Sequence, residues 1–547
     1  MYWINKSILI SGFWLVAFGA MAQSRTGVEV GQLSEIEPFS ISVIDKPQKK
    51  LPPDQWQNST ANIIEELLEE LAVNGGSAML NDLLGQVLLS GGTPPPGGND
   101  LASLRRLRLQ SALALGRFSA VSEILSRSPG AYKDPELTAI AVNALLAQGN
   151  TVTACALSQQ LSQARGASFW LQMRAFCLAI QGNTAGAELT AELAITAADG
   201  NPNFLNWINR LTTPAETKKT VDVQSYLELA MAEAANTFAS NQNLPSGLRV
   251  ALARWPDEQS LPVLMQVFAD GLVPVNVVAE RLFAHAKTLA KPEPETPTEQ
   301  TGEQVTPLTV LELELATLNQ IKTDTGIDLI ASLFALGHNA QSQAVRAEAL
   351  ALLLQIEQPF KSWAAMHRLV AEEIKTIAPE PVLARYAPAF AKAALVTGNV
   401  SSAKKWLQLL PPEERAALSL QQVLFAIGGP ALPAQQTPDD ILVTDVFSTI
   451  ALGRKLSPKL RHWLSSKNAG NTKNCPIGKQ TALISSARQH ALAETVFRAA
   501  DILRNDSFAS LPPLCAMSVI EALRTVGLKQ QARLGALEWM FEQRAAK

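Results

Sequence analysis

The sequence predicts an all-α protein in which helix–turn–helix units follow one another along the chain. Two observations lead to this fold class. Hydrophobic residues make up 47% of the 547 residues and aromatic residues only 6%, with alanine and leucine dominant, and this composition favours helices over strands. In addition, apolar helices that each end at a glycine recur at a fixed spacing along part of the chain.

The overall charge argues against two classes of protein. The formal net charge is −3 and the isoelectric point is near 6.1. A chain that neutralises many phosphates carries a basic excess, so nucleic acid is not expected as a partner. Wholesale disorder is not expected either, because disordered chains combine low hydrophobicity with high net charge.

Residues 1–22 are typical of a secretory signal peptide. Lys6 supplies a positive start, residues 8–18 form an apolar run, and Ala20-Met21-Ala22 provides the small-x-small pattern that precedes cleavage at Gln23. The apolar run is shorter than the ~20 residues that span a bilayer. We therefore expect cleavage near Ala22/Gln23, export to a periplasm and no membrane span afterwards. An uncleaved membrane anchor is the alternative.

Four cysteines remain after this cleavage, an even number that suits an oxidising compartment. They allow three pairings, and we prefer Cys155–Cys177 with Cys475–Cys515 because each bridge then stays within one half of the chain. Buried free thiols are the alternative. A metal site is not expected, since no two cysteines have the spacing of metal ligands and no histidine is close to them in sequence.

Composition also divides the chain into regions. Residues 23–57 contain four prolines and no sustained helical period, which indicates an extended or disordered leader. Residues 291–307 are rich in proline, glutamate and threonine and are typical of a mobile linker. We therefore expect two helical repeat regions, at 58–290 and 308–547.

The most informative feature is a period of 33 residues. Gly116, Gly149 and Gly182 are spaced by this distance, and each ends an apolar helix that is followed by a polar turn and a second helix. Glycine suits this position because helices often end in a left-handed residue, a conformation that glycine adopts at little cost. The pattern returns at Gly398 and Gly527.

These units resemble the tetratricopeptide repeat, a helix–turn–helix unit of 34 residues. Small residues follow four of the five glycines by five positions, where two helices approach closely, at Ala154, Ala187, Ala403 and Ala532. Near the C-terminus, three residues match the small–aromatic–small spacing of the second helix although no glycine precedes them: Ala493, Phe497 and Ala500. The resemblance covers residues 101–200 and patches of 325–545. Residues 201–325 do not align with it, and the aromatic positions of the first helix are mostly missing.

The resemblance implies a right-handed α-solenoid in two helical halves, because one helical hairpin cannot bury its apolar face alone and stacks on its neighbours. It also implies a concave surface that binds peptides or other proteins. Cys155 would then lie on the second helix of one unit and Cys177 on the first helix of the next, which supports their pairing.

The sequence contains no convincing catalytic motif. Residues 470–479 have seven residues between their glycines where a phosphate loop has four. Ser402 and Lys405 match the SxxK pattern of some acyl enzymes, but the accompanying KTG element is missing. The five histidines are scattered, and paired carboxylates are adjacent in sequence. We therefore expect no enzyme, no metal and no cofactor.

Two groups of residues are candidate binding groups. Arg105, Arg106 and Arg108 form a basic cluster, for which a solvated helix face is the simplest interpretation and contact with an acidic partner or lipid head group is the alternative. Tryptophans recur about once per helical unit and are expected to be core residues, with any exposed ones serving as binding anchors. They are Trp170, Trp207, Trp255, Trp363, Trp406, Trp463 and Trp539.

The expected function is that of a periplasmic, non-catalytic scaffold that mediates protein–protein interaction in the bacterial cell envelope. The alternative is a peptidoglycan-binding protein or an accessory to a cell-wall enzyme, because similar exported superhelices accompany the catalytic domains of soluble lytic transglycosylases. In this chain no compact α+β catalytic domain follows the helices, which favours the scaffold.

Overall fold

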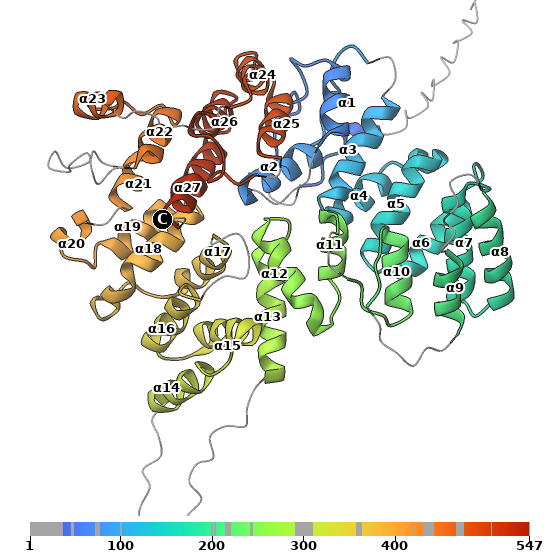
Figure 1. Cartoon of the computed structure of the whole chain (residues 1–547), viewed down its shortest axis with the longest axis horizontal. Coiled ribbons are helices and arrows are strands. Elements are labelled where there is room, and N and C mark those ends of the chain that lie inside the picture. The colour runs from blue at the N-terminus through green and yellow to red at the C-terminus, as the bar shows by residue number, and fades with distance from the viewer. Residues whose placement is uncertain are drawn as a thin grey trace, which may run out of the picture. The chain divides into compact units, whose positions relative to one another are not determined.

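A computed structural model describes residues 37–44, 49–71, 77–98, 101–197, 201, 204–213, 220–240, 244–289, 310–356, 364–417, 420–429, 442–466, 475–504 and 506–545. The described chain is all-helical, and one isolated bridge between Val221 and Ala239 is its only β-type pairing. Residues 36–547 form one compact unit (Figure 1). The predicted signal peptide and the predicted linker 291–307 lie outside the described residues.

The first set of helices is α1 (Ala61–Glu69), α2 (Ala78–Leu89), α3 (Ala102–Ala114), α4 (Phe118–Ser126), α5 (Pro135–Ala147), α6 (Thr151–Gln160), α7 (Ser168–Ile180), α8 (Thr184–Thr196), α9 (Phe204–Thr212), α10 (Tyr226–Ala234), α11 (Ser246–Ala253), α12 (Leu261–Ala269) and α13 (Val275–Leu289). The second set is α14 (Val310–Ile321), α15 (Gly326–Asn339), α16 (Gln343–Leu353), α17 (Ala364–Glu373), α18 (Ala387–Val396), α19 (Val400–Leu407), α20 (Pro412–Ala417), α21 (Leu420–Ala426), α22 (Val443–Ala451), α23 (Pro458–Ser466), α24 (Ile477–Arg488), α25 (Leu492–Leu503), α26 (Pro513–Thr525) and α27 (Lys529–Ala545).

Consecutive helices pack as hairpins, such as α5 on α6, α7 on α8, α18 on α19 and α26 on α27. The five predicted turn glycines have φ between +72° and +89°, the left-handed conformation expected of them. In each turn two backbone N–H groups bond back into the first helix. The N–H of Gly116 donates to the carbonyl of Leu113 at 2.9 Å and that of Arg117 to Ala112 at 3.0 Å, so the last carbonyls of the helix are satisfied.

The same turn occurs without a predicted glycine in the unit that contains Ala493, Phe497 and Ala500. His490 takes the glycine position there with φ +56°. Its N–H donates to Ala487 and the next N–H donates to Ser486, at 3.1 and 3.0 Å. The repeat geometry is therefore retained although the residue that signals it in the sequence is absent.

Beyond α9 the chain folds back on the first repeat units. Helix α10 packs against α5 and α7, and α11 packs against α3 and α5. The Tyr226 hydroxyl donates to the carbonyl of Leu113 at 3.2 Å, and Nε of Arg254 donates to that of Ala147 at 2.9 Å. One face of the first helices of these units is thus occupied by other helices of the same chain.

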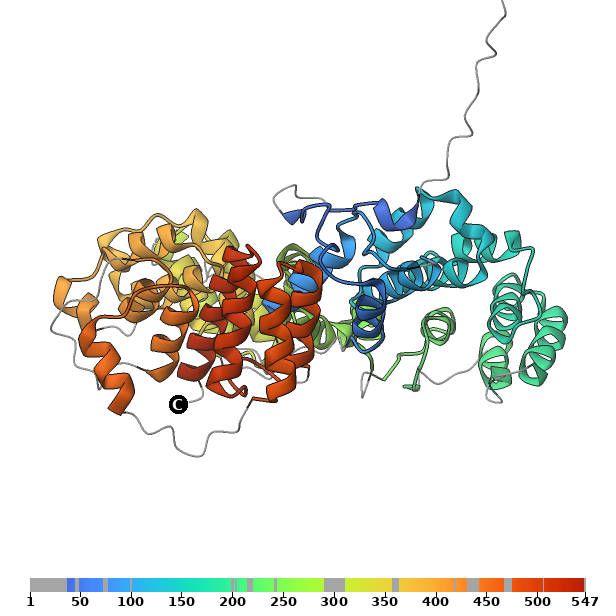
Figure 2. The same ribbon diagram turned by 90° about the horizontal axis from the view of Figure 1, so that it is seen from above.

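The N-terminal helices pack against the C-terminal ones. Helix α1 contacts α25, and α2 contacts both α25 and α27, as the blue and red ribbons show in Figures 1 and 2. Glu538 on α27 accepts hydrogen bonds from the Ala78 N–H at 2.9 Å and the Ser77 hydroxyl at 2.6 Å, so it caps α2. In a stack where each unit contacts only its neighbours, such contacts between distant segments do not form.

The described part of the predicted leader, residues 37–44 and 49–57, has no α-helix, but it is not a disordered segment. Phe39 and Trp56 are both fully buried, with ring centroids 5.1 Å apart. Arg108, itself 1% exposed, donates to the carbonyls of Phe39 and Ile41 at 2.7 and 3.1 Å. Tertiary partners therefore hold this part of the leader, which was expected to be extended or disordered, against the core.

Two disulfides join neighbouring helices. Cys155 on α6 pairs with Cys177 on α7, and Cys475, just before α24, pairs with Cys515 on α26. Their Cα atoms are 5.8 and 5.3 Å apart, and this is the pairing preferred from the sequence. Disulfides are typical of proteins outside the cytoplasm. Among the described helices, none combines the length and the apolar character needed to cross a membrane.

Candidate functional site

The residues that the sequence offers as binding groups belong mainly to the core. Six of the seven tryptophans are buried, and Trp363 lies outside the described residues. The basic cluster is not a uniform solvated face. Arg108 is buried, while Arg105 and Arg106 pair with Glu37 and Glu136 at 3.4 and 3.2 Å. Neither group therefore supplies an exposed anchor in the described structure.

The structure covers the weak catalytic motifs only in part, because residues 470–474 lie outside the described residues. Ser402 and Lys405 lie on the short helix α19, within a repeat hairpin. His285 pairs with Asp328 at 2.8 Å, and this pair links α13 to α15. In the part of the chain that the structure describes, no group of three or more His, Cys, Asp or Glu side chains could hold a metal ion.

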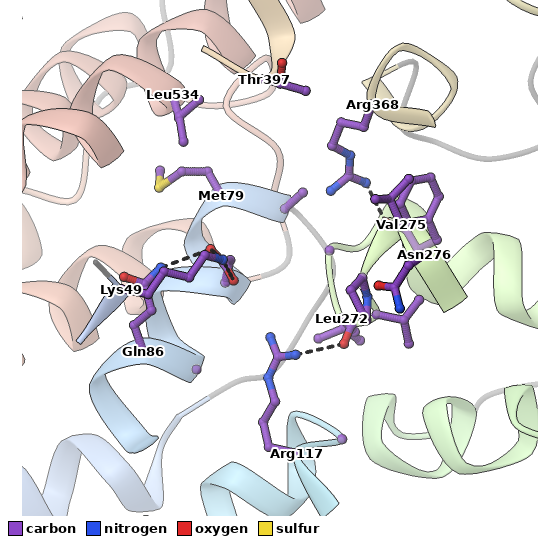
Figure 3. A pocket seen from close by; sticks show the side chains of 18 of the residues that line it. Lys49, Met79, Gln86, Arg117, Leu272, Val275, Asn276, Arg368, Thr397 and Leu534 are labelled. Carbon is purple, nitrogen blue, oxygen red and sulfur yellow. Dashed lines mark hydrogen bonds and ion pairs between the residues drawn. The ribbon is translucent and has the colours of Figure 1, made fainter. Parts of the chain in front are cut away.

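The structure reveals a cavity that the sequence did not indicate. Its volume is about 840 Å³, and its walls come from α2, the start of α4, the turn between α12 and α13, α17 and α27 (Figure 3). Much of the lining is apolar, including Met79, Leu89, Val250, Leu272, Leu534 and Phe541. Volume and lining both fall within the range of ligand pockets.

Helix α2 occupies the centre of this arrangement because most of its residues are apolar or small. Ten of its twelve residues are buried, so it is covered on nearly every side. The Asn81 amide donates to the carbonyl of Asp270 at 2.7 Å and ties α2 to the turn after α12. In that turn Gly271 has φ +74°, and a Cβ there would lie 2.7 Å from the Cα of Ala78. Glycine is therefore required for the close approach of the turn to α2.

The carboxylates that line the cavity all have partners within the protein. Asp82 pairs with Lys49 at 2.8 Å, and Glu372 pairs with Lys375 at 2.6 Å. Glu123 pairs with Arg127, four residues along α4. Glu538 caps the N-terminus of α2 by accepting hydrogen bonds from it. Burial raises the pKa of Glu538, because its effect outweighs that of these hydrogen bonds.

Arg368 on α17 points into the cavity (Figure 3). Its Nη2 donates to the carbonyls of Phe268 and Ala269, the latter at 3.0 Å, and its guanidinium lies 4.7 Å from the centre of the Phe268 ring. Its Nε is buried and has no hydrogen-bond partner among the described residues. Burial lowers the pKa of Arg368, although carboxylates in the surroundings, first Glu538, oppose this shift.

Arg117, immediately before α4, points into the same cavity (Figure 3). Its Nη1 donates to the carbonyl of Leu272 at 3.0 Å. The guanidinium rests on α2 at Gly85, where a Cβ would lie 2.9 Å from Nε. Within the described ranges, neither Arg117 nor Arg368 forms an ion pair with a carboxylate.

Two helices begin at the cavity wall. Ser119 in the first turn of α4 and Asn276 in the first turn of α13 are both lining residues. Neither helix has an acidic residue in its first turn. The N-terminus of a helix carries a partial positive charge, so both ends add positive potential to the cavity.

Sequence reasoning missed this cavity because its walls are contributed by segments far apart in the chain. Two local features of the sequence mark the arginines of the cavity: Arg117 directly follows the repeat glycine Gly116, and Arg368 interrupts the apolar pattern of α17. Neither position indicates which segment it faces.

Comparisons with known proteins do not add to this description. No protein-family model, no curated protein and no solved structure matches the chain. The resemblance to tetratricopeptide repeats therefore depends on the glycine-closed hairpins and on the spacing of small and aromatic residues, and the candidate site depends on its geometry.

Proposed function

We propose that this protein is a non-catalytic, tetratricopeptide-like scaffold of the bacterial cell envelope, and that it binds a polypeptide segment of another envelope protein in the cavity between α2, α4, α13, α17 and α27. The cavity itself carries the proposal. It is large enough for several residues of a peptide, and it combines apolar walls with a few charged groups, as ligand sites do.

The proposed location is the periplasm, reached through the signal peptide with cleavage near Ala22/Gln23. The two disulfides support a compartment outside the cytoplasm, since thiols stay reduced inside it. A cavity that opens to the periplasm would be accessible to other exported chains.

The cavity is a better binding site than the face of the repeats at 101–200. Helices α10 and α11 already cover α3 and α5, and the tryptophans considered as anchors are buried where they are described. A partner on that face would have to displace two packed helices, whereas the cavity needs no displacement of a helix.

Peptidoglycan binding is the alternative that the sequence leaves open, and one experiment separates the two. A photo-crosslinking amino acid is placed at Asn276, an exposed residue on the cavity wall, and in a control chain at Ala185, an exposed residue of α8 away from the cavity. Both chains carry a C-terminal affinity tag and are expressed in living cells.

We expect repeated capture of the same envelope protein from Asn276 and not from Ala185. Capture of peptidoglycan fragments alone from Asn276 would replace the scaffold with a cell-wall-binding protein. Equal capture from both positions, or none from either, would contradict the assignment of the cavity as the binding site.

A further inference from the structure

We infer that a surface formed by helix α23 and the residues just before it binds the anionic head groups of a lipid bilayer. Its basic side chains are those of Lys455, Lys459 and Arg461, and we call it the α23 surface. None of the three lines the cavity. Membrane binding here therefore goes beyond the proposed function and depends on it only for a location in the cell envelope, where a membrane is within reach.

Residues 446–493 differ in charge from the rest of the chain. They include no aspartate or glutamate, although the whole chain contains 49 acidic residues and has a formal net charge of −3. Eight lysines and arginines lie in this stretch: Arg454, Lys455, Lys459, Arg461, Lys467, Lys473, Lys479 and Arg488. A basic stretch in a chain of this net charge is typical of local contact with an anionic partner.

Part of this positive charge is used within the fold. Nη2 of Arg454 donates to a backbone carbonyl at 2.9 Å, and Lys479 pairs with Asp501 at 2.8 Å. Lys467 and Lys473 lie outside the described residues, so they are not counted as part of the α23 surface.

The basic residues of the α23 surface are open to solvent. Lys455, Lys459 and Arg461 are exposed, and within the described chain their side chains form no hydrogen bond and no ion pair. Helix α23 packs against α22 at the edge of the molecule (Figure 1). The acidic residue of α22, Asp445, is 3% exposed and pairs with Arg544 at 2.8 Å. Asp445 is therefore not available to neutralise the α23 surface.

Apolar side chains lie beside these charges. Leu460 and Leu464 are partly buried against a small apolar cluster that is separate from the main core. In a helix of 3.6 residues per turn, Lys459 and Arg461 lie on either side of this apolar row. A bilayer surface offers negative head groups above an apolar layer, an arrangement that suits apolar residues flanked by long basic side chains. A segment of acidic side chains offers the charge without the apolar layer, so the α23 surface fits the bilayer better.

The test uses the full mature chain and two kinds of vesicle. One kind contains phosphatidylcholine alone, and the other contains equal parts of phosphatidylcholine and the anionic lipid phosphatidylglycerol. Flotation over a lipid titration measures the partition of the protein in ~0.1 M salt. We expect binding to the anionic vesicles only, and its loss in ~1 M salt, because the Debye length falls from ~10 Å to ~3 Å between these conditions.

A triple variant tests the α23 surface itself. Lys455→Gln, Lys459→Gln and Arg461→Gln together remove its described positive charge. Each basic residue near an anionic bilayer strengthens binding about fivefold, so we expect the triple variant to weaken partition to the anionic vesicles roughly a hundredfold. Its melting temperature should stay that of the parent, since exposed side chains without partners contribute little to stability.

A second triple variant is the matched control. Arg165→Gln, Lys322→Gln and Lys404→Gln change the net charge by the same amount at exposed residues outside the 446–493 stretch, and none of the three forms an ion pair in the described structure. We expect this variant to bind the anionic vesicles as the parent does.

Several outcomes would overturn membrane binding by the α23 surface. Equal losses in the two triple variants would show that the vesicles respond to overall charge. Binding to phosphatidylcholine vesicles, or binding that survives ~1 M salt, would contradict recognition of head-group charge. Polyglutamate serves as the probe for an acidic polypeptide, and its binding without binding of anionic vesicles would make such a polypeptide the occupant.

The membrane contact and the proposed function can fail separately. If the anionic vesicles are not bound while a crosslinker at Asn276 captures a partner in cells, the membrane contact fails and the scaffold stands. If the vesicles are bound as expected but nothing is captured from Asn276, the cavity fails as the partner site and the α23 surface stands.

Discussion

Replacement of Gly271 by alanine should loosen the contact between the turn after α12 and the start of α2. Two effects add at this position. Gly271 has φ +74°, a conformation that costs a residue with a Cβ roughly 1–2 kcal/mol. The new Cβ would also lie 2.7 Å from both the Cα and the carbonyl oxygen of Ala78, far inside the usual contact distance of about 3.5–4.0 Å.

The steric effect cannot be relieved by rotating a side chain, because the overlapping atoms belong to the backbone of α2. The helix or the turn has to move, which weakens the bonds from Asn81 to Asp270 and from Arg117 to Leu272. A neutral hydrogen bond contributes about 0.5–1.5 kcal/mol and a charged one about 1.5–3. With the backbone cost included, we expect Gly271→Ala to lower the free energy of unfolding of this region by roughly 3–5 kcal/mol.

Gly182→Ala is the matched control. Gly182 has φ +80°, but nothing lies within 4 Å of the position of its missing Cβ, so only the backbone cost of roughly 1–2 kcal/mol applies. Native-state hydrogen exchange, read by mass spectrometry, reports the stability of separate regions. Gly271→Ala should speed exchange in α2 and the turn after α12, whereas Gly182→Ala should act on α7 and α8. Equal losses in the two variants, or unchanged exchange in α2, would refute the close approach.

Three further predictions concern other parts of the molecule. Arg108→Met removes four hydrogen bonds to the carbonyls of Leu88, Pro38, Phe39 and Ile41. We expect urea unfolding to show that the free energy of unfolding falls by at least about 3 kcal/mol, against less than about 1 kcal/mol for the surface control Arg106→Met. Similar losses in the two variants would contradict the role of Arg108. Burial, helped by the neighbouring Glu538, raises the pKa of Glu542 to about 8 from 4.5, while the Ala509 N–H and Ser507 oppose the shift. Because the folded state holds this proton more tightly, the stability that protonated Glu542 contributes is full below pH ~4.5 and is lost as pH rises through ~8. Glu542→Gln should therefore unfold at higher urea than the parent at pH ~8 and at nearly the same urea at pH ~4.5, and a pH-independent difference would exclude this titration. His490→Gly relieves the strain of a φ of +56° at an exposed residue, and we expect urea titration to show that the free energy of unfolding rises by about 1 kcal/mol. A loss of stability would instead show that the His490 side chain contributes contacts.

Local features of the chain are encoded in its sequence. Helical periodicity and capping depend on residues within a turn or two of each other, so the helices and the turns at Gly116 and Gly398 could be predicted. The pairing of Cys155 with Cys177 was preferred because the bridge stays within one half of the chain, and the structure places the two residues on the adjacent helices α6 and α7. His490 marks the limit of such reasoning, because the turn persists there without its glycine.

The sequence by itself determined the helical class and the glycine-closed hairpins, since both depend on neighbours along the chain. Only the tertiary structure decided that α10 folds back on α5, that Arg108 holds the segment around Phe39 in the core, and that α2 lies against α27. The bond from Ala78 to Glu538 joins residues 460 positions apart. No periodicity indicates such a pairing, because it depends on how every intervening helix packs, and the cavity with its two arginines exists only where these distant segments meet.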